Sequence, residues 1–280
     1  MSLAESEFSS ALYLSEREVS IEPLSFFRGR KKFKAWKNLA GFRLNRLNFQ
    51  TRLVIADLQP WQFCTLLGQR TCQARESVDS SWLANCIKLN EEFGFGEASS
   101  DSFPSLNEYL DRGLVNPFWP IIHNAAVTVQ KNSKRSYREV DVMLRAQLGV
   151  IEQLTRRAVI LKLHVETTLN DSSEVDETAI FRKFVDAFQN PEVRLNFFRA
   201  YPVLLRSVHA KLESWVSTTE EFLARLENDK ASLHATFGLS ETAVIERVVS
   251  AGDTHNNGRS VLILFFDNGS AIVYKPRSVD

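Results

Sequence analysis

The sequence predicts an α+β fold that is predominantly α-helical and ends in a small antiparallel β-meander. Two observations lead to this prediction. Over most of the chain, apolar residues recur at three- and four-residue spacing, as they do on the buried face of a helix. Near the C-terminus, residues 261–266 form an unbroken apolar run followed by an Asn-Gly pair, which is typical of a buried strand entering a tight hairpin. We therefore expect a helical region over residues 1–240 and strands over residues 241–280.

The composition is that of an ordinary globular protein. Hydrophobic residues make up 44% of the 280 residues, charged residues make up 24%, and 34 basic residues balance 34 acidic ones. This balance does not indicate a nucleic-acid partner, and no apolar run approaches the roughly 20 residues of a membrane span. The three cysteines form no Cys-x-x-Cys pair, and the N-terminus lacks a signal peptide. We expect a cytoplasmic protein with no nucleic-acid partner and no membrane span.

Residues 26–52 contain nine Lys and Arg residues and no acid. Aromatic residues interleave with these charges, namely Phe26, Phe27, Phe33 and Trp36. One interpretation is a basic patch for an acidic peptide or nucleic acid. The other is an amphipathic helix with its aromatic residues packed inward and its lysines in water. We favour the helix, because acidic residues elsewhere in the chain can neutralise the segment.

Several helices are expected after this segment. Their predicted ranges are 82–93, 105–110, 121–130, 136–169, 172–188, 191–201 and 202–234. The sequence Asn-Pro-Phe-Trp-Pro over residues 116–120 predicts a rigid turn, since each proline fixes its own backbone angle. The four histidines in these helical segments stand singly, so they receive no functional role.

The C-terminal region predicts three strands. They are expected at residues 242–249, 261–266 and 271–274, with a polar, glycine-containing loop over residues 252–260. Lys275 ends the third strand, because the following proline cannot donate to a strand ladder. This order is the layout of the nucleotide-binding lobe of a kinase, in which the loop covers the phosphates and the lysine contacts them. On pattern alone, a meander packed on helices, with Lys275 and Arg277 in solvent, is the simpler interpretation.

Asp253 and His255 are candidate catalytic residues because they lie in the predicted loop between strands. In an extended segment, residues two apart can point to the same side. The histidine can exchange a proton near neutral pH, and the carboxylate can orient it. The alternative is a structural turn at Asp253 with an exposed histidine.

The identities of these residues resemble a known family. Gly-Asp-Thr-His-Asn-Asn-Gly-Arg-Ser over residues 252–260, Asn-Gly at 268–269 and Val-Tyr-Lys-Pro-Arg-Ser at 273–278 resemble the dehydratase region of the class II lanthipeptide synthetases, the LanM family. The similarity is dense over residues 252–278 and continues loosely back to residue 201.

The resemblance implies a lipid-kinase-like core with helical additions. Such enzymes phosphorylate Ser and Thr of a ribosomal precursor peptide with ATP and Mg²⁺, and then eliminate phosphate to leave dehydroamino acids. By this resemblance, Lys275 would contact the ATP phosphates, and Asp253 and His255 would take part in elimination. Arg259 and Arg277 would be phosphate or structural partners.

The resemblance also implies parts that the sequence does not contain. A catalytic-loop acid, metal-binding residues and a second lobe would follow Lys275, as would a cyclase domain with zinc ligands. We therefore expect an N-terminal portion of such a dehydratase, a truncated kinase-like lobe that is inactive without the missing C-terminal part. The alternative, from another class, is a non-catalytic helical module that binds a peptide or another partner through residues 26–52 or through apolar helical faces.

Overall fold

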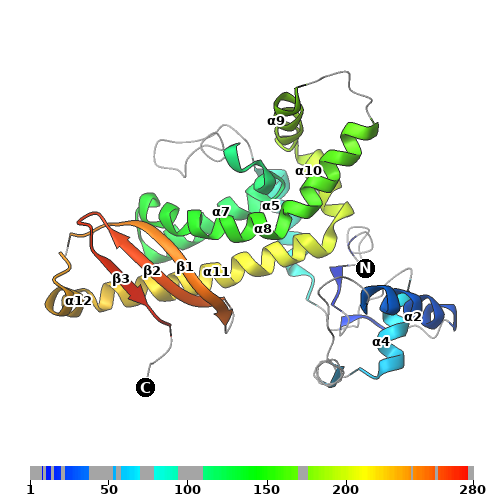
Figure 1. The fold of residues 1–280 in the computed structure, drawn as a ribbon, viewed down its shortest axis with the longest axis horizontal. Coiled ribbons are helices and arrows are strands. Elements are labelled where there is room, and N and C mark those ends of the chain that lie inside the picture. The colour runs from blue at the N-terminus through cyan, green and yellow to red at the C-terminus, as the bar shows by residue number, and fades with distance from the viewer. Residues whose placement is uncertain are drawn as a thin grey trace. The chain divides into compact units, whose positions relative to one another are not determined.

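The fold is that of a computed structural model. It describes residues 8, 11–13, 16–19, 23–37, 53–54, 58–69, 79–93, 110–169, 176–240, 242–255 and 258–276, and gives only the backbone for residues 23, 35–37, 110–112, 169 and 252–255. The chain forms two compact units, Met1–Leu83 and Ala84–Asp280. Figure 1 labels the elements of each unit.

In the N-terminal unit, helix α2 (Pro23–Lys37) packs against helix α4 (Pro60–Gly68). The two backbones approach so closely that only glycine fits at the crossing. A Cβ atom built on Gly29 would lie 1.5 Å from a carbonyl oxygen of α4, and one built on Gly68 would lie 1.7 Å from a carbonyl oxygen of α2. The absence of a side chain at these positions therefore sets the distance between the helices.

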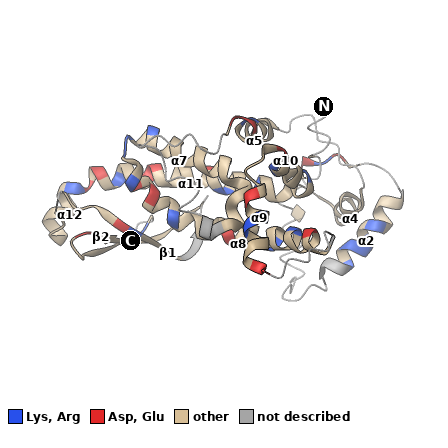
Figure 2. Ribbon diagram, turned by 90° about the horizontal axis from the view of Figure 1, so that it is seen from above, with Lys and Arg blue, Asp and Glu red and all other residues tan. Residues whose placement is uncertain are grey.

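The described part of the basic segment is helical. Figure 2 shows basic residues along α2, and the lysines Lys31, Lys32 and Lys34 are exposed. Phe33 packs edge-to-face on Phe63 of α4, with ring centroids 5.6 Å apart. Phe27, in contrast, is 62% exposed, so not every aromatic residue of the segment points inward. Residues 38–52 lie outside the described residues.

The C-terminal unit contains most of the helices. They are α5 (Ser81–Glu92, which begins just before the unit), the 3₁₀ helix η3 (Leu110–Phe118), α7 (Trp119–Ser133), α8 (Tyr137–Leu169), α9 (Glu177–Ala187), α10 (Pro191–Ala200), α11 (Pro202–Asn228) and α12 (Lys230–Phe237). The helices α7, α8 and α11 contact one another, and η3 packs against α7, α8, α9 and α10. None of the helices in the described ranges is long and apolar enough to cross a membrane.

Arg194 holds the turn before α10 in place from inside the core. It is 0% exposed, and its guanidinium donates to the side-chain oxygen of Asn90 at 2.7 Å and to the backbone oxygen of Asn90 at 2.9 Å. It also donates to the carbonyl oxygens of Phe188 at 2.7 Å and Gln189 at 3.0 Å. Burial lowers the pKa of Arg194 to about 10, so it stays charged at neutral pH. One buried cation thereby joins α5 to the α9–α10 connection.

The sheet is a three-stranded antiparallel meander in the order β1 (Ile245–His255), β2 (Arg259–Phe266) and β3 (Ala271–Tyr274). The predicted hairpin is confirmed: Gly269 has a φ of 80°, and its N–H donates to the carbonyl of Phe266 at 3.0 Å. Mostly helical structure with this small C-terminal sheet confirms the predicted α+β fold class.

Three predicted elements differ in the structure. The polar loop expected over residues 252–260 is shorter, because β1 continues to His255 and β2 begins at Arg259. The turn expected at residues 116–120 is the end of η3 and the start of α7. The single helix expected over residues 202–234 is two helices, which meet at Asp229.

The change from helix to strand falls between the end of α12 at Phe237 and the start of β1 at Ile245, which brackets the expected boundary at residue 240. The two compact units divide elsewhere, between residues 83 and 84. The division of the chain into a helical domain and a β-domain therefore stays a prediction.

Candidate functional site

The sheet has two chemically different faces. Its inner face lies on α8 and α11 and buries Val248, Leu264 and Phe266. Side chains alternate between the two faces along each strand. The residues that neighbour these three in the sequence therefore point to the opposite face of the sheet. Figure 1 shows that second face turned away from the helices, and no element among the described residues covers it. We call it the outward face.

The outward face is apolar across all three strands. It is formed by Val249, Ala251, Val261, Ile263, Phe265, Ala271 and Val273. The register sets Ile263 between Val249 and Val273, which are 37% and 54% exposed. Arg247 stacks over the ring of Phe265, 3.7 Å from its centroid. A flat apolar ligand could cover this surface, with a gain of roughly 25 cal/mol for each Å² of apolar area buried.

Lys275 lies at one end of the outward face. It is two residues beyond Val273, so it shares that face by alternation, and it is exposed. Continuing the β2–β3 register places Lys275 beside Val261, whose other neighbour is Ala251 of β1. No carboxylate in the described part of the chain pairs with the Lys275 ammonium group. That group is therefore available to an anionic ligand.

Asp253 and His255 lie at the same end of the sheet. Their backbones form the last residues of β1, and His255 is opposite Arg259 where the β1–β2 connection begins. Their side chains are outside the described residues, so their geometry stays a prediction. The strand order and register nevertheless bring the segment of Asp253 and His255 to the end of the sheet that carries Lys275.

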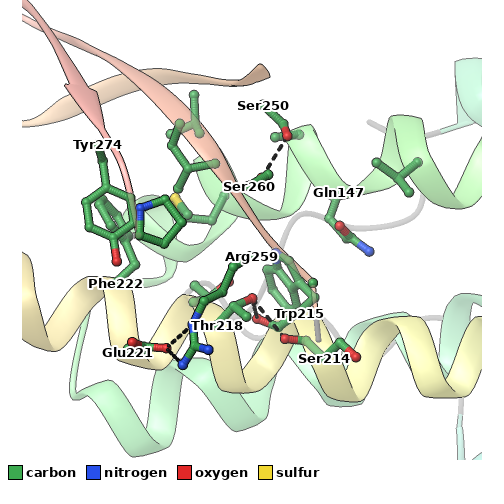
Figure 3. Close-up of a pocket in the computed structure, with 18 of the residues that line it drawn as sticks. Gln147, Ser214, Trp215, Thr218, Glu221, Phe222, Ser250, Arg259, Ser260 and Tyr274 are labelled. Carbon is green, nitrogen blue, oxygen red and sulfur yellow. Dashed lines mark hydrogen bonds and ion pairs between the residues drawn. The ribbon is translucent and has the colours of Figure 1, made fainter. Parts of the chain in front are cut away.

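Arg259 is held by a helix. Its Nε and Nη2 atoms both donate to the Oε2 atom of Glu221 on α11, at 3.0 and 2.7 Å, as Figure 3 shows. The other oxygen of Glu221 accepts from Arg225, which also donates to the hydroxyl of Tyr274 at 2.9 Å. Of the two roles predicted for Arg259, the structure therefore shows a structural one. Arg277 lies outside the described residues.

Sequence reasoning missed Glu221 and Arg225. A charged residue on an amphipathic helix is ordinarily assigned to solvent. The spacing of four residues between Glu221 and Arg225 was a readable signal for an ion pair on one helix. Nothing local in the sequence indicates the contacts of this pair with β2 and β3.

The described residues of the site offer groups that suit a nucleotide. Lys275 can hold a phosphate, and the outward face offers an apolar surface for a base. Among the residues that the structure describes, no group of three His, Cys, Asp or Glu side chains could hold a metal ion.

The comparison with known families points to the same part of the chain. Residues 201–280 match a family model described as a domain of unknown function, DUF4135. This domain is found in lanthionine synthetase C-like, LanM-type proteins. The matched residues comprise α11, α12 and the whole sheet, and so include the outward face and Lys275. No curated protein matches the sequence.

Proposed function

We propose that this chain is the N-terminal portion of a lanthipeptide dehydratase that works in the cytoplasm and uses the outward face of its sheet to bind ATP. The observation that carries the proposal is the position of Lys275 at the end of an uncovered apolar sheet face, beside the segment of Asp253 and His255. The match of residues 201–280 to a domain of LanM-type proteins supports the same function.

In this proposal, some residues of the sheet bind ATP and others transfer protons. The outward face contacts the base, and Lys275 pairs with the phosphates through its ammonium group. When bound with Mg²⁺, ATP supplies the phosphoryl group that the hydroxyl of a Ser or Thr in the precursor peptide accepts.

Elimination then needs a base for the Cα proton of the phosphorylated residue and a proton donor or cation at the leaving phosphate. As the Cα–H bond breaks, its electron pair forms the Cα–Cβ double bond, and the Cβ–O bond breaks to release phosphate. Asp253 and His255 are proposed for this step, with the carboxylate orienting the imidazole.

ATP binding by the 280-residue chain tests the proposal most directly. The measurement is a fluorescence titration with an ATP analogue that carries a fluorophore on its ribose, in the presence of Mg²⁺. We expect saturable binding, weakened about tenfold or more by Lys275→Ala, because a hydrogen bond to a charged group is lost. Lys183→Ala, which removes an exposed lysine on α9, is the matched control and should leave binding unchanged. Equal binding by wild type and Lys275→Ala would refute the assignment of Lys275.

A second candidate function is a non-catalytic module that binds a peptide. The observation that favours it is an exposed apolar stripe on α8, formed by Leu154, Leu161 and Val165, which are 41%, 53% and 42% exposed. Leu154→Asp with Leu161→Asp should then weaken binding of a helical precursor peptide, while Lys275→Ala should have no effect. The opposite pattern in the two assays favours the dehydratase.

A further inference from the structure

A cavity lies behind the sheet, on the side opposite the outward face. It has a volume of about 80 Å³ and lies between the inner face of the sheet, α8 and α11, partly open to solvent, as Figure 3 shows. Met143, Trp215, Phe222 and Leu262 form its apolar walls. A water molecule occupies about 30 Å³ in the liquid. The cavity therefore accommodates a few waters or one group of about the size of a phosphate.

The walls of this cavity carry hydrogen-bond donors that the protein leaves unused. Gln147 is only 9% exposed, and its Nε2 group has no acceptor in the described structure. Lys211 of α11 is half-buried at the wall, and no carboxylate of the described residues pairs with its ammonium group. Ser250 donates to Ser260 at 2.9 Å, which leaves the hydroxyl hydrogen of Ser260 without an acceptor in the described part of the chain. Each of these donors can serve a ligand that accepts hydrogen bonds.

The charge of the lining also favours an anion. Two cations, Lys211 and Arg259, and one carboxylate, Glu221, line the cavity, which gives a net charge of +1. Glu221 is already held by Arg259 and Arg225 through both of its oxygens. The positive charge of Lys211 is thus left uncompensated at the wall of a partly enclosed space, where charge interactions are stronger than in water.

Two hydroxyls at the cavity wall offer hydrogen-bond acceptors. Ser214 donates to the carbonyl of Ala210 at 3.0 Å, and Thr218 donates to the carbonyl of Ser214 at 2.8 Å. Because their hydrogens are directed into α11, these hydroxyls present lone pairs to any further partner. A ligand that matches the whole lining must therefore be an oxyanion that also carries a hydrogen of its own.

We propose that this cavity binds a small protonated oxyanion of the hydrogenphosphate class. Its oxygens accept from Gln147, Lys211 and Ser260, and its hydroxyl donates to Ser214 or Thr218. The site is separate from the face that carries Lys275, and the proposal does not depend on ATP binding there. Inorganic hydrogenphosphate keeps this hydrogen at neutral pH, whereas most of a phosphate monoester such as phosphoserine, with a second pKa of about 6, does not.

The test is a titration of the full chain with inorganic phosphate at constant ionic strength, followed by ³¹P NMR line broadening and calorimetry. We expect saturable binding, and we expect Lys211→Met and Gln147→Leu each to raise the Kd about tenfold. The matched control is Lys183→Met on α9, which should bind as the wild type does. Circular dichroism melts of each variant show that the chain is folded.

Two further ligands define the specificity of the cavity. Sulfate, which carries no hydrogen at neutral pH, should bind more weakly than phosphate, and equal affinity would overturn the requirement for a donated hydrogen. O-phosphoserine, whose phosphate group is mostly without a hydrogen at neutral pH, should also bind more weakly than inorganic phosphate, and equal affinity would overturn the same requirement.

The proposal is overturned if wild-type protein shows no saturable phosphate binding, in which case the cavity holds water only. It is also overturned if Lys211→Met and Gln147→Leu bind phosphate as the wild type does. Lys275→Ala should leave phosphate binding at the cavity intact, so failure here and failure of the ATP proposal are distinguishable.

Discussion

Replacing Arg194 tests whether one buried cation holds the helical core of the C-terminal unit together. The substitution Arg194→Met keeps an unbranched side chain of similar length and removes the guanidinium. It leaves both Asn90 oxygens and the carbonyls of Phe188 and Gln189 without this donor, inside a region where Arg194 is fully buried.

The expected loss follows from these contacts. A buried acceptor left without a donor costs about 1–3 kcal/mol of folding free energy. Four such acceptors would cost roughly 4–12 kcal/mol if none of them found another donor. The apolar methionine recovers part of this, and the arginine itself was desolvated, which its lowered pKa reflects. We therefore expect a net loss of about 3–5 kcal/mol, near the low end of the cost of four unsatisfied acceptors.

The assay is urea denaturation followed by circular dichroism, with Arg199→Met as the control. Arg199 lies on the same helix and pairs with Glu192 at 3.3 Å on the surface, so its replacement should cost less than about 1 kcal/mol. Arg194→Lys should fall between the two, because an ammonium group can satisfy only some of the acceptors. A loss below about 1 kcal/mol for Arg194→Met would refute the reasoning.

Two further predictions concern backbone contact and pH. Gly29→Ala should disrupt the N-terminal unit, because its Cβ atom would lie 1.5 Å from the backbone of α4. Gly149→Ala in α8 is the control, since its Cβ atom meets nothing within 4 Å, and it should raise the free energy of unfolding by about 0.5–1 kcal/mol in thermal or urea melts. Burial lowers the pKa of His123 below its ordinary 6.5, so the unfolded chain binds a proton first as the pH falls. The contribution of His123 to stability should therefore be fully present above about pH 6.5 and decrease below it. His123→Gln should weaken this pH dependence of the unfolding free energy in urea titrations between pH 7.5 and 5. An unchanged dependence would contradict the lowered pKa of His123.

Local chemistry explains what the sequence predicts correctly. The Asn268-Gly269 turn is confirmed because a positive φ is a property of the glycine itself. The end of β3 next to Lys275 is likewise set by Pro276, which the structure places just after the strand. These features depend on a few neighbouring residues, so a single sequence contains them.

Features that depend on partners far along the chain were missed. The strand β1 extends to His255 although Gly252, Asp253 and Thr254 favour a loop, because His255 pairs with Arg259 of β2 beyond an irregularity in the ladder after Ala251. Arg194 occupies a predicted helix, but its partner Asn90 lies 104 residues earlier. The cavity behind the sheet needs α8, α11 and all three strands together. Neither partner nor cavity leaves a periodic signal in the sequence.

The contacts of Glu221 and Arg225 have a mechanical consequence. One turn of α11 is hydrogen-bonded both to Arg259 at the start of β2 and to Tyr274 at the end of β3. Tilting the sheet on α11 would break both contacts at once, so the two elements move together. Because α11 also packs against α7 and α8, a displacement of the sheet would deform these helix contacts as well.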